Sequence, residues 1–564
     1  MSEPIDISPS QRKELLALIQ RHLPNVEVWA FGSRVKWTAR SNSDLDLVVF
    51  AKAEDEARVS RLKEALEESS LPFRVDLLVW DNIPEDFKKN IRERYVVLVE
   101  AAKTGSGRFV GAGLPITEVV EFTPSRQIKR GAVVPFVDMA ALLENQRDIS
   151  YVSEREFTGG GSRFQNGDTL FARITPCLEN GKTAKVSALP DGVVAHGSTE
   201  FIVMAAKAPE YDADYIYYLA RHPEFRAFAE ARMEGTSGRQ RVSWQALSDF
   251  TFAFPSPDQR KTIGSALRKF DDKIDLNRRI NQTLEAMAQA IFKSWFVDFD
   301  PVKAKIVAKQ EGRDPLRAAM SAISGKPDAE LDTLPNEQYD ALAATAALFP
   351  DAMEESELGE IPRGWFVRTT PDCIEVNPAR ALKKGTVAQY LDMANVPTNS
   401  ARVQNVVPRE FTSGSKFMNG DTLLARITPC LENGKTAFVD FLNGDEVGWG
   451  STEFIVLRPK NGLPEPFAYF LCRHPDFRAF AISQMAGTSG RQRVPNDCFG
   501  GYRLVEPAAP VSVEFGRLAS AALNQIKALD EEAKTLASLR DSMLPKLLSG
   551  ELSVETLAEA AGAA

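Results

Sequence analysis

Cysteine and histidine are scarce in this sequence. Its 564 residues include five cysteines and four histidines, with no Cys-x-x-Cys or His-x-x-x-His pair. A zinc site or a disulfide framework needs such residues at close, regular spacing. The composition therefore argues against both.

Long apolar runs are also missing. No stretch of 18 or more apolar residues occurs, and the start, MSEPIDISPSQRKE, lacks the basic-then-apolar order of a signal peptide. We therefore expect a cytoplasmic protein that makes no membrane contact. At about 100 to 200 residues per domain, this length predicts three or four domains.

Basic charge is in deficit, since the net charge is −9. Such a deficit counts against nucleic-acid binding, because phosphate contacts need lysine and arginine. The acid excess is local, however. Residues 301–360 hold 6 basic and 12 acidic residues, whereas residues 361–507 hold 17 basic and 14 acidic ones. Local basic faces therefore remain compatible with the sequence.

An internal repeat dominates what is present. Residues 164–184 read FQNGDTLFARITPCLENGKTA, and residues 417–437 match them at 19 of 21 positions. The motifs GSTEF, RHP-E/D-FRAFA and GTSGRQRV also occur twice at nearly the same spacing. Because solenoid repeats are only about 20 to 50 residues long, this spacing indicates a duplicated domain. Short runs between Asn-Gly and Gly-Lys turns predict that each copy is rich in β-strands.

A long helix is predicted after each copy. Ile263, Leu267, Phe270 and Ile274 step by four, three and four residues, and the pattern resumes after one slip near Asn277. A similar seam begins at residue 515, after the second copy. Such a seam usually indicates ordinary core packing, but two equivalent helices after two equivalent domains favour pairing with each other.

This layout resembles the specificity subunits of type I restriction-modification systems. Supporting details are ELGEIPRGW at residues 357–365 and LPKLLSGEL at residues 544–552. The resemblance implies two target-recognition domains that alternate with two antiparallel helical spacers and recognise a bipartite target in double-stranded DNA. It also implies two methyltransferase subunits and restriction/translocase subunits as partners. S-adenosylmethionine and ATP are then expected on those partners only, and the specificity part itself has no catalytic site.

The similarity of the two copies adds an expectation about the target. If an approximate two-fold relates the copies, similar domains should recognise similar half-sites in inverted orientation. We therefore expect a bipartite and partly palindromic DNA sequence.

Candidate DNA contacts lie in segments that both copies share. Arginine, glutamine and threonine there can bind base edges or phosphates. The alternative is that shared residues form the scaffold and unshared ones determine specificity. The candidates are Arg173, Lys182, Thr236, Arg239, Gln240 and Arg241 in the first copy, with Arg426, Lys435, Thr488, Arg491, Gln492 and Arg493 in the second.

The first hundred residues are unrelated to the repeat. A predicted strand ends at Gly32 and Ser33, and a second begins with Asp44-Leu-Asp46. Because alternate strand residues face the same side, the two aspartates should project together, with Leu45 and Leu47 toward the core. Asp76 lies within a third apolar strand, so we expect it to be buried among apolar residues and therefore to require a partner or a metal.

This set resembles the minimal nucleotidyltransferases of the polymerase-β-like superfamily. The resemblance implies that Asp44, Asp46 and Asp76 are catalytic and bind Mg²⁺, and that Gly32 and Ser33 hold the phosphates of a nucleoside triphosphate. A domain that keeps the fold and only binds a partner is the alternative. Members of this superfamily modify RNA ends, antibiotics or protein side chains, and the resemblance leaves the acceptor open among them.

We therefore expect a multidomain α+β protein. Its leading interpretation is a DNA specificity subunit with an N-terminal domain of regulatory role. The alternatives are a nucleotidyltransferase targeted by the duplicated region, and an assembly scaffold. The expected segments are a nucleotidyltransferase-like α/β domain at 8–101, a linker at 102–113, recognition domains at 114–257 and 361–507, helical spacers at 258–300 and 508–552, and an acidic, alanine-rich linker with helical pieces at 301–360.

Overall fold

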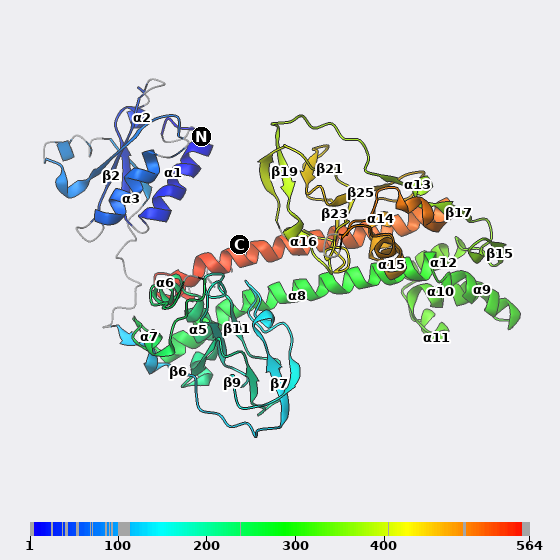
Figure 1. Ribbon diagram of the computed structural model, residues 1–564, viewed down its shortest axis with the longest axis horizontal. Helices are drawn as coiled ribbons and strands as arrows, with labels where there is room; N and C mark the ends of the chain where they lie inside the picture. The colour runs from blue at the N-terminus through cyan, green and yellow to red at the C-terminus, as the bar shows by residue number, and fades with distance from the viewer. Residues whose placement is uncertain are drawn as a thin grey trace. The chain divides into compact units, whose positions relative to one another are not determined.

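The computed structural model of the chain is shown in Figure 1. It describes residues 5–23, 26–36, 38–39, 43–51, 56–67, 69, 71–84, 87–89, 91, 94–99, 113–236, 238–403, 405–488 and 492–554. The described residues fall into two compact units. Ile116–Phe250 and Pro257–Pro545 form the larger unit, and the N-terminal domain belongs to the smaller one.

The N-terminal domain is built on a four-stranded sheet. Its order is β3-β2-β1-β4, with β2 and β3 parallel and the other pairs antiparallel. Helices α1 and α3 pack on the sheet through a core that includes Leu15, Ile19 and Leu62. The bounds are α1 Pro9–His22, β1 Val28–Phe31, α2 Ser33–Lys36, β2 Leu45–Val49, α3 Glu56–Glu67, β3 Val75–Val79 and β4 Val96–Val99.

Each repeat contains two four-stranded sheets with the same strand order. In the first repeat these are β11-β10-β13-β6 and β8-β7-β12-β9, and in the second β23-β22-β25-β18 and β20-β19-β24-β21. The first repeat has β6 Val120–Phe122, β7 Val133–Val137, β8 Ser153–Glu156, β9 Ser162–Phe164, β10 Thr169–Ala172, β11 Thr183–Lys185, β12 Ala195–Gly197 and β13 Phe201–Ala206. The second has β18 Ile374–Val376, β19 Val387–Leu391, β20 Val407–Glu410, β21 Ser415–Phe417, β22 Thr422–Ala425, β23 Thr436–Phe438, β24 Gly448–Gly450 and β25 Phe454–Pro459. The predicted strand-rich duplication is confirmed.

Two helices follow the sheets in each repeat. They are α5 Pro209–Arg221 and α6 Pro223–Glu230 in the first, and α14 Pro466–Arg473 and α15 Pro475–Ser483 in the second. The duplicated histidines begin the second helix of each pair. Nδ1 of His222 accepts from the backbone N–H of Glu224, and His474 does the same with Asp476, each at 3.3 Å. These histidines therefore serve as helix caps.

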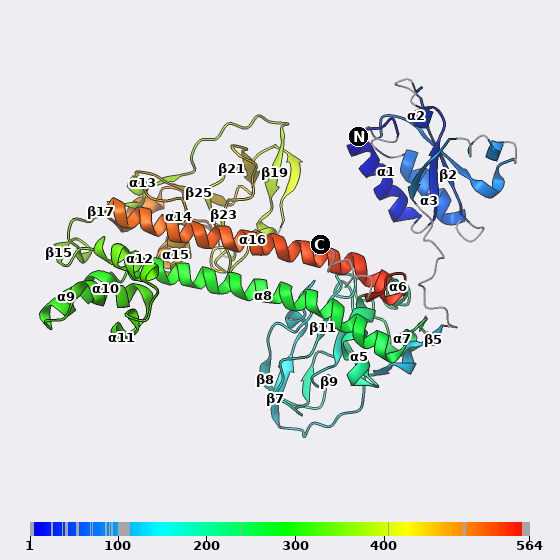
Figure 2. The ribbon, with the colours of Figure 1, turned by 180° about the vertical axis from the view of Figure 1, so that it is seen from behind.

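The two long helices lie side by side and antiparallel in both views (Figures 1 and 2). Helix α8 spans Pro257–Phe296 and α16 spans Ala509–Leu548, 40 residues each. Phe292 packs on Phe515 near one end, and Asp271 pairs with Arg540 toward the other. The prediction that the two spacers pair with each other is confirmed.

A buried amide marks the middle of this helix pair. Asn277, at the predicted slip in the seam, is fully buried. Its Nδ2 donates to the carbonyl of Leu529 at 3.3 Å and to Glu532 Oε2 at 2.7 Å. Leu529 is the residue that the repeat aligns with Asn277, so the approximate two-fold passes between them. A buried polar residue in an apolar seam favours one register over its neighbours.

A buried ion pair fastens the helices to the first repeat. Arg540 of α16 and Asp271 of α8 are 1% and 5% exposed and form a direct ion pair. The hydroxyl of Tyr218, on α5, donates to the other oxygen of Asp271 at 2.5 Å. On the other side, Glu285 of α8 accepts from the hydroxyl of Tyr469 in the second repeat. Helix α8 is thus anchored to both repeats.

The predicted acidic linker forms helices with a small core of their own. Helix α10 packs against α9 and α12, around Ala319, Met320, Leu331 and Ala346. The helices are α9 Asp300–Gln310, α10 Pro315–Ser324, α11 Asp328–Leu331 and α12 Asn336–Ala347. Among all the described helices, none is long and apolar enough to cross a membrane.

Removal of the buried cation should destabilise the helix pair strongly. Arg540→Met leaves Asp271 buried without its cation, so we expect a loss of about 3–5 kcal/mol in unfolding free energy. Chemical unfolding followed by helical circular dichroism measures this loss.

Arg517→Met is the matched control, because Arg517 lies on the same helix in an exposed pair with Glu514. That change should cost about 1 kcal/mol or less. The double variant Arg540→Met/Asp271→Leu should recover most of the loss. Equal effects of the two single changes would contradict a stabilising role for the buried pair.

Candidate functional site

Three aspartates lie toward one end of the N-terminal sheet. Asp46 on β2 and Asp76 on β3 are register partners on parallel strands, so their side chains leave the sheet on the same side. Asp44 directly precedes β2 and is exposed. Leu45 and Leu47 are fully buried in the core. The predicted alternation of aspartate and leucine is therefore confirmed.

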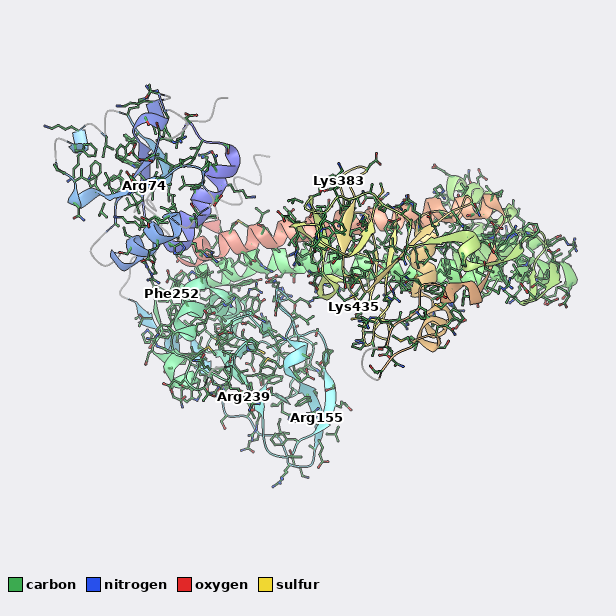
Figure 3. The ribbon with its side chains drawn as sticks, turned by 45° about the horizontal axis from the view of Figure 1, so that its top comes forward. Arg74, Arg155, Arg239, Phe252, Lys383 and Lys435 are labelled. Carbon is green, nitrogen blue, oxygen red and sulfur yellow. The ribbon has the colours of Figure 1, made fainter. Side chains whose placement is uncertain are left out.

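Asp76 differs from the expectation in its burial. Its side chain is 44% exposed and pairs with Arg74, whose Nε lies 3.2 Å from Asp76 Oδ1. The physical reason is the strand order, because β3 is an edge strand and only β2 flanks it. The expectation that Asp76 is buried among apolar strand residues was wrong. Figure 3 labels Arg74 in this domain.

The electrostatics around Asp46 favour a cation. Burial, together with the charges of Asp76 and Asp44, raises the pKa of Asp46. Carboxylate oxygens are the ligands that Mg²⁺ prefers, and a bound cation relieves their repulsion. The chemistry of the three side chains thus fits the metal. Within the described residues, no group of three or more potential ligands is yet gathered closely enough to hold an ion.

Gly32 is required by the close approach of Asp46. It has a φ of +81°, and a Cβ atom at this position would lie 2.0 Å from Asp46 Oδ2. Only glycine satisfies both conditions without strain. The next residue, Ser33, begins α2, as the predicted turn at the start of a helix requires. A role for Gly32 and Ser33 in phosphate binding stays a prediction.

Arg34 is a positioning residue that the sequence did not reveal. Its guanidinium is buried and donates to the carbonyl of Ser43, at 3.0 Å from Nε and 2.8 Å from Nη2. It also donates to the carbonyl of Asp6 at 2.9 Å and stacks over the ring of Phe73. These contacts hold the residue just before Asp44. The position of Arg34 directly after Gly32 and Ser33 was the only signal in the sequence for this role.

In each repeat the two predicted DNA-binding segments lie together. The backbone N–H of Thr175 donates to the carbonyl of Gln240 at 3.1 Å, and Gln240 N–H donates to the hydroxyl of Thr175 at the same distance. Thr428 and Gln492 form the corresponding backbone bond in the second repeat. The ITPCLENG segment and the GTSGRQR loop therefore form one surface.

The last arginine of each loop is already paired. Arg241 donates to both carboxylate oxygens of Glu200 at 2.7–3.0 Å, and Arg493 does the same with Glu453. These glutamates are the acidic residues of the duplicated GSTEF motif, a link that the sequence did not reveal. The ion pairs stabilise the base of each loop. Either arginine would have to break its ion pair with the glutamate in order to bind DNA.

The other candidates divide into exposed and tethered groups. Thr236, Arg239 and Thr488 are exposed on the loops, and Figure 3 labels Arg239. Arg491 lies outside the described residues. Lys182 and Lys435 donate to the backbone carbonyls of Met139 and Met393, at 3.3 and 2.6 Å. The remaining pair, Arg173 and Arg426, each line a hollow in their repeat.

Comparison with known proteins identifies both parts of the chain. Residues 13–104 match the family described as polymerase beta, nucleotidyltransferase, and residues 115–286 match the type I restriction modification DNA specificity domain. The N-terminal region is 46% identical over 101 residues to a probable protein adenylyltransferase, MntA, of Haemophilus influenzae. That match covers 18% of this chain and 89% of the relative. The first domain belongs to the polymerase β nucleotidyltransferases, and the duplicated region is homologous to type I specificity subunits.

The specificity-subunit relationship extends over most of the chain. The HindI type I specificity subunit of the same organism is 26% identical over 438 residues, which cover 74% of this chain and 94% of the relative. A solved type I S subunit from M. genitalium is 12% identical and covers 78% of this chain and 99% of that chain. Its TM-score is 0.40, too low to support a conclusion about the fold.

Metal binding should be visible in the backbone of the nucleotidyltransferase domain. Because the folded-state pKa of Asp46 is raised above its ordinary value of 3.8, the charged form is disfavoured in the fold. Stability is then lost as the pH rises from 3.8 through the folded-state pKa, and Asp46 is destabilising at neutral pH. Millimolar Mg²⁺ should therefore slow amide hydrogen exchange in strands β1 and β2 of the intact chain at neutral pH.

Asp46→Asn should raise this protection without metal and remove the response to Mg²⁺. Glu64→Gln, an exposed change on α3, is the control and should keep the wild-type response. If exchange in the wild-type chain is the same with and without Mg²⁺, the aspartates are not a metal site.

Proposed function

We propose that this chain is the DNA-recognition subunit of a type I restriction-modification complex. The observation that carries the proposal is that two equivalent domains are both attached to one antiparallel pair of helices. Asn277 marks the approximate two-fold, and α8 is anchored to the first repeat through Asp271 and to the second through Glu285. Two similar recognition surfaces are thus held at a fixed separation.

The dimensions of the helix pair suit a bipartite target. A helix of 40 residues is about 60 Å long, which exceeds the roughly 34–36 Å of one turn of DNA. The first repeat contacts α8 near its start, through Asp212 and Arg260, and the second near its end, through Phe467 and Phe292. The two domains can therefore contact separated half-sites. Because the two domains are related by an approximate two-fold, we propose a partly palindromic target in double-stranded DNA.

The homology also supports the proposed partners. The curated relatives carry the name of type I restriction enzyme specificity subunits. We propose two methyltransferase subunits and restriction/translocase subunits as partners of this chain. S-adenosylmethionine and ATP would bind those partners, because the duplicated region itself would provide recognition without catalysis.

Methylation mapping tests this role directly. The chain, co-expressed with a type I methyltransferase subunit, should produce genomic methylation at a bipartite motif with two inverted, related half-sites. Single-molecule sequencing measures the modified bases. Omission of this chain is the control and should abolish the methylation. A motif with two unrelated half-sites would contradict the prediction of a partly palindromic target. A contiguous motif would contradict the prediction of a bipartite target.

For the N-terminal domain we propose transfer of a nucleotide, with a protein side chain as the acceptor. Support comes from the set Asp44, Asp46 and Asp76, from the glycine that Asp46 requires, and from 46% identity to a probable protein adenylyltransferase. The three aspartates would hold Mg²⁺, which supplies charge neutralisation for the triphosphate and activation of the attacking hydroxyl. Arg34 positions the segment just before Asp44, and Gly32 leaves room for the carboxylate of Asp46.

A second candidate function makes this transfer the main activity, delivered to DNA or to a complex by the duplicated region. The presence of all three aspartates supports this second candidate function. Incubation of the purified complex with α-labelled ATP should label a protein subunit. The label should disappear in Asp44→Asn and Asp46→Asn but persist in Glu64→Gln. Labelling that survives both aspartate changes would exclude this site as its source.

A further inference from the structure

Two hollows occupy the same place in the two repeats. The first is about 430 Å³ and the second about 350 Å³. In each hollow, all but one of the lining residues have their repeat counterpart in the lining of the other. The basic lining residues are Arg126, Arg163 and Arg173 in the first and Arg380, Lys416 and Arg426 in the second. Neither lining contains an acidic residue, so both hollows are suited to an anionic polymer.

The frame of each hollow is rigid and is the same in both repeats. A Cβ atom on Gly161 would lie 2.3 Å from the carbonyl oxygen of Gly197, and one on Gly414 would lie 2.0 Å from that of Gly450. The serine after each of these glycines donates its hydroxyl to a strand carbonyl, at 2.7 and 2.8 Å. Glycine is therefore required at both sites, and the walls are pre-organised.

Some of the basic side chains complete the frame. Arg126 donates to both carboxylate oxygens of Asp168, at 2.5 and 2.9 Å, and Arg380 pairs with Asp421 at 3.0 Å. The carboxylates of Asp168 and Asp421, which do not line the hollows, thus partly compensate the charges of Arg126 and Arg380. The arginines that continue from β10 and β22, Arg173 and Arg426, have no carboxylate partner among the described residues. Arg163 and Lys416 also lack a carboxylate partner among the described residues, but each donates to a backbone carbonyl of the frame, at 2.6 and 3.2 Å.

The largest difference between the hollows is one residue at the rim. The first has Trp244, which is 39% exposed and stacked on Phe122. The counterpart in the second is Asn496, whose Oδ1 accepts from Arg426 Nη1 at 2.9 Å. Arg426 is therefore oriented by an amide. In the first hollow, an indole takes the place of that amide, and the described residues offer the Arg173 guanidinium no hydrogen-bond acceptor.

We propose that each hollow receives base edges of one DNA half-site. Arg173 and Arg426 recognise a base position that the two half-sites share. The difference between Trp244 and Asn496 determines a base position at which the half-sites differ. This inference rests on the proposed DNA-recognition function and assigns its specificity to named residues.

The chemistry of the side chains supports this division. Arginine pairs bidentately with the O6 and N7 acceptors of guanine, so the shared arginine predicts a shared guanine. Asparagine forms hydrogen bonds with base edges, whereas an indole offers an apolar face with one donor. Exchange of one for the other therefore changes the preferred base. The backbone of Arg173 is also joined to the end of the loop, because Val242 N–H donates to the carbonyl of Arg173 at 3.0 Å.

Reciprocal exchange at the rim tests the proposal. The wild-type chain, Trp244→Asn and Asn496→Trp are each assembled with the methyltransferase subunit, and bound sequences are selected from a random DNA pool. In Trp244→Asn, the base selected at one position of the first half-site should become the one found in the second half-site. In Asn496→Trp, the base at the corresponding position of the second half-site should become the one found in the first. Val133→Asn, an exposed apolar change elsewhere on the first repeat, is the control and should leave the motif unchanged. Thermal unfolding identifies any variant that does not fold, and the two exchanges test the same prediction independently.

Loss of the arginine gives a second readout. Arg173→Met should lower affinity for the selected motif by about tenfold to a hundredfold and relax one base position. Arg155→Met removes the same charge from the exposed strand β8 of the same repeat (Figure 3) and should only weaken binding uniformly across sequences. Equal effects of the two changes, or rim exchanges that leave the motif intact, would overturn the inference. A wild-type complex that selects no motif would overturn the DNA-recognition function as well.

Discussion

The seam between α8 and α16 is the constraint on which the larger unit depends. Hydrophobic packing alone would let two antiparallel helices slide by a turn at little cost, because leucine and isoleucine fit several registers. The buried amide of Asn277 and the pair Asp271–Arg540 remove that freedom, because a slipped register separates Asn277 Nδ2 from the carbonyl of Leu529 and Asp271 from its cation. The separation of the two repeats is thereby set by a few polar contacts.

The same logic recurs inside each repeat. Loops that carry small residues are held at their bases by ion pairs, Arg241–Glu200 and Arg493–Glu453, and the hollows are bounded by glycines that no other residue can replace. Rigid frames of this kind leave the exposed side chains free to vary. The two copies therefore share the frame and differ at the rim, where Trp244 of the first copy corresponds to Asn496 of the second.

Much of this was predictable because the signals were local or repeated. The alternation around Asp46 placed two aspartates and two leucines on opposite sides of one strand, and the two helical seams predicted their pairing. The exposure of Asp76 was not predictable, because it depends on β3 being an edge strand. Nor did the sequence reveal the partner of Arg241, since Glu200 lies in another motif and only the folded chain joins them.

By itself the sequence determined the composition of the chain: a nucleotidyltransferase segment, two copies of a strand-rich domain and two helices of matched length. Those features follow from periodicity, motif order and internal identity, which are properties of neighbouring residues. The tertiary structure alone decided the register of the helices, the role of Arg34 and the hollows beside Arg173 and Arg426. Each of these is assembled from segments distant in the chain, and long-range packing and desolvation, which leave no local pattern, determine their contacts.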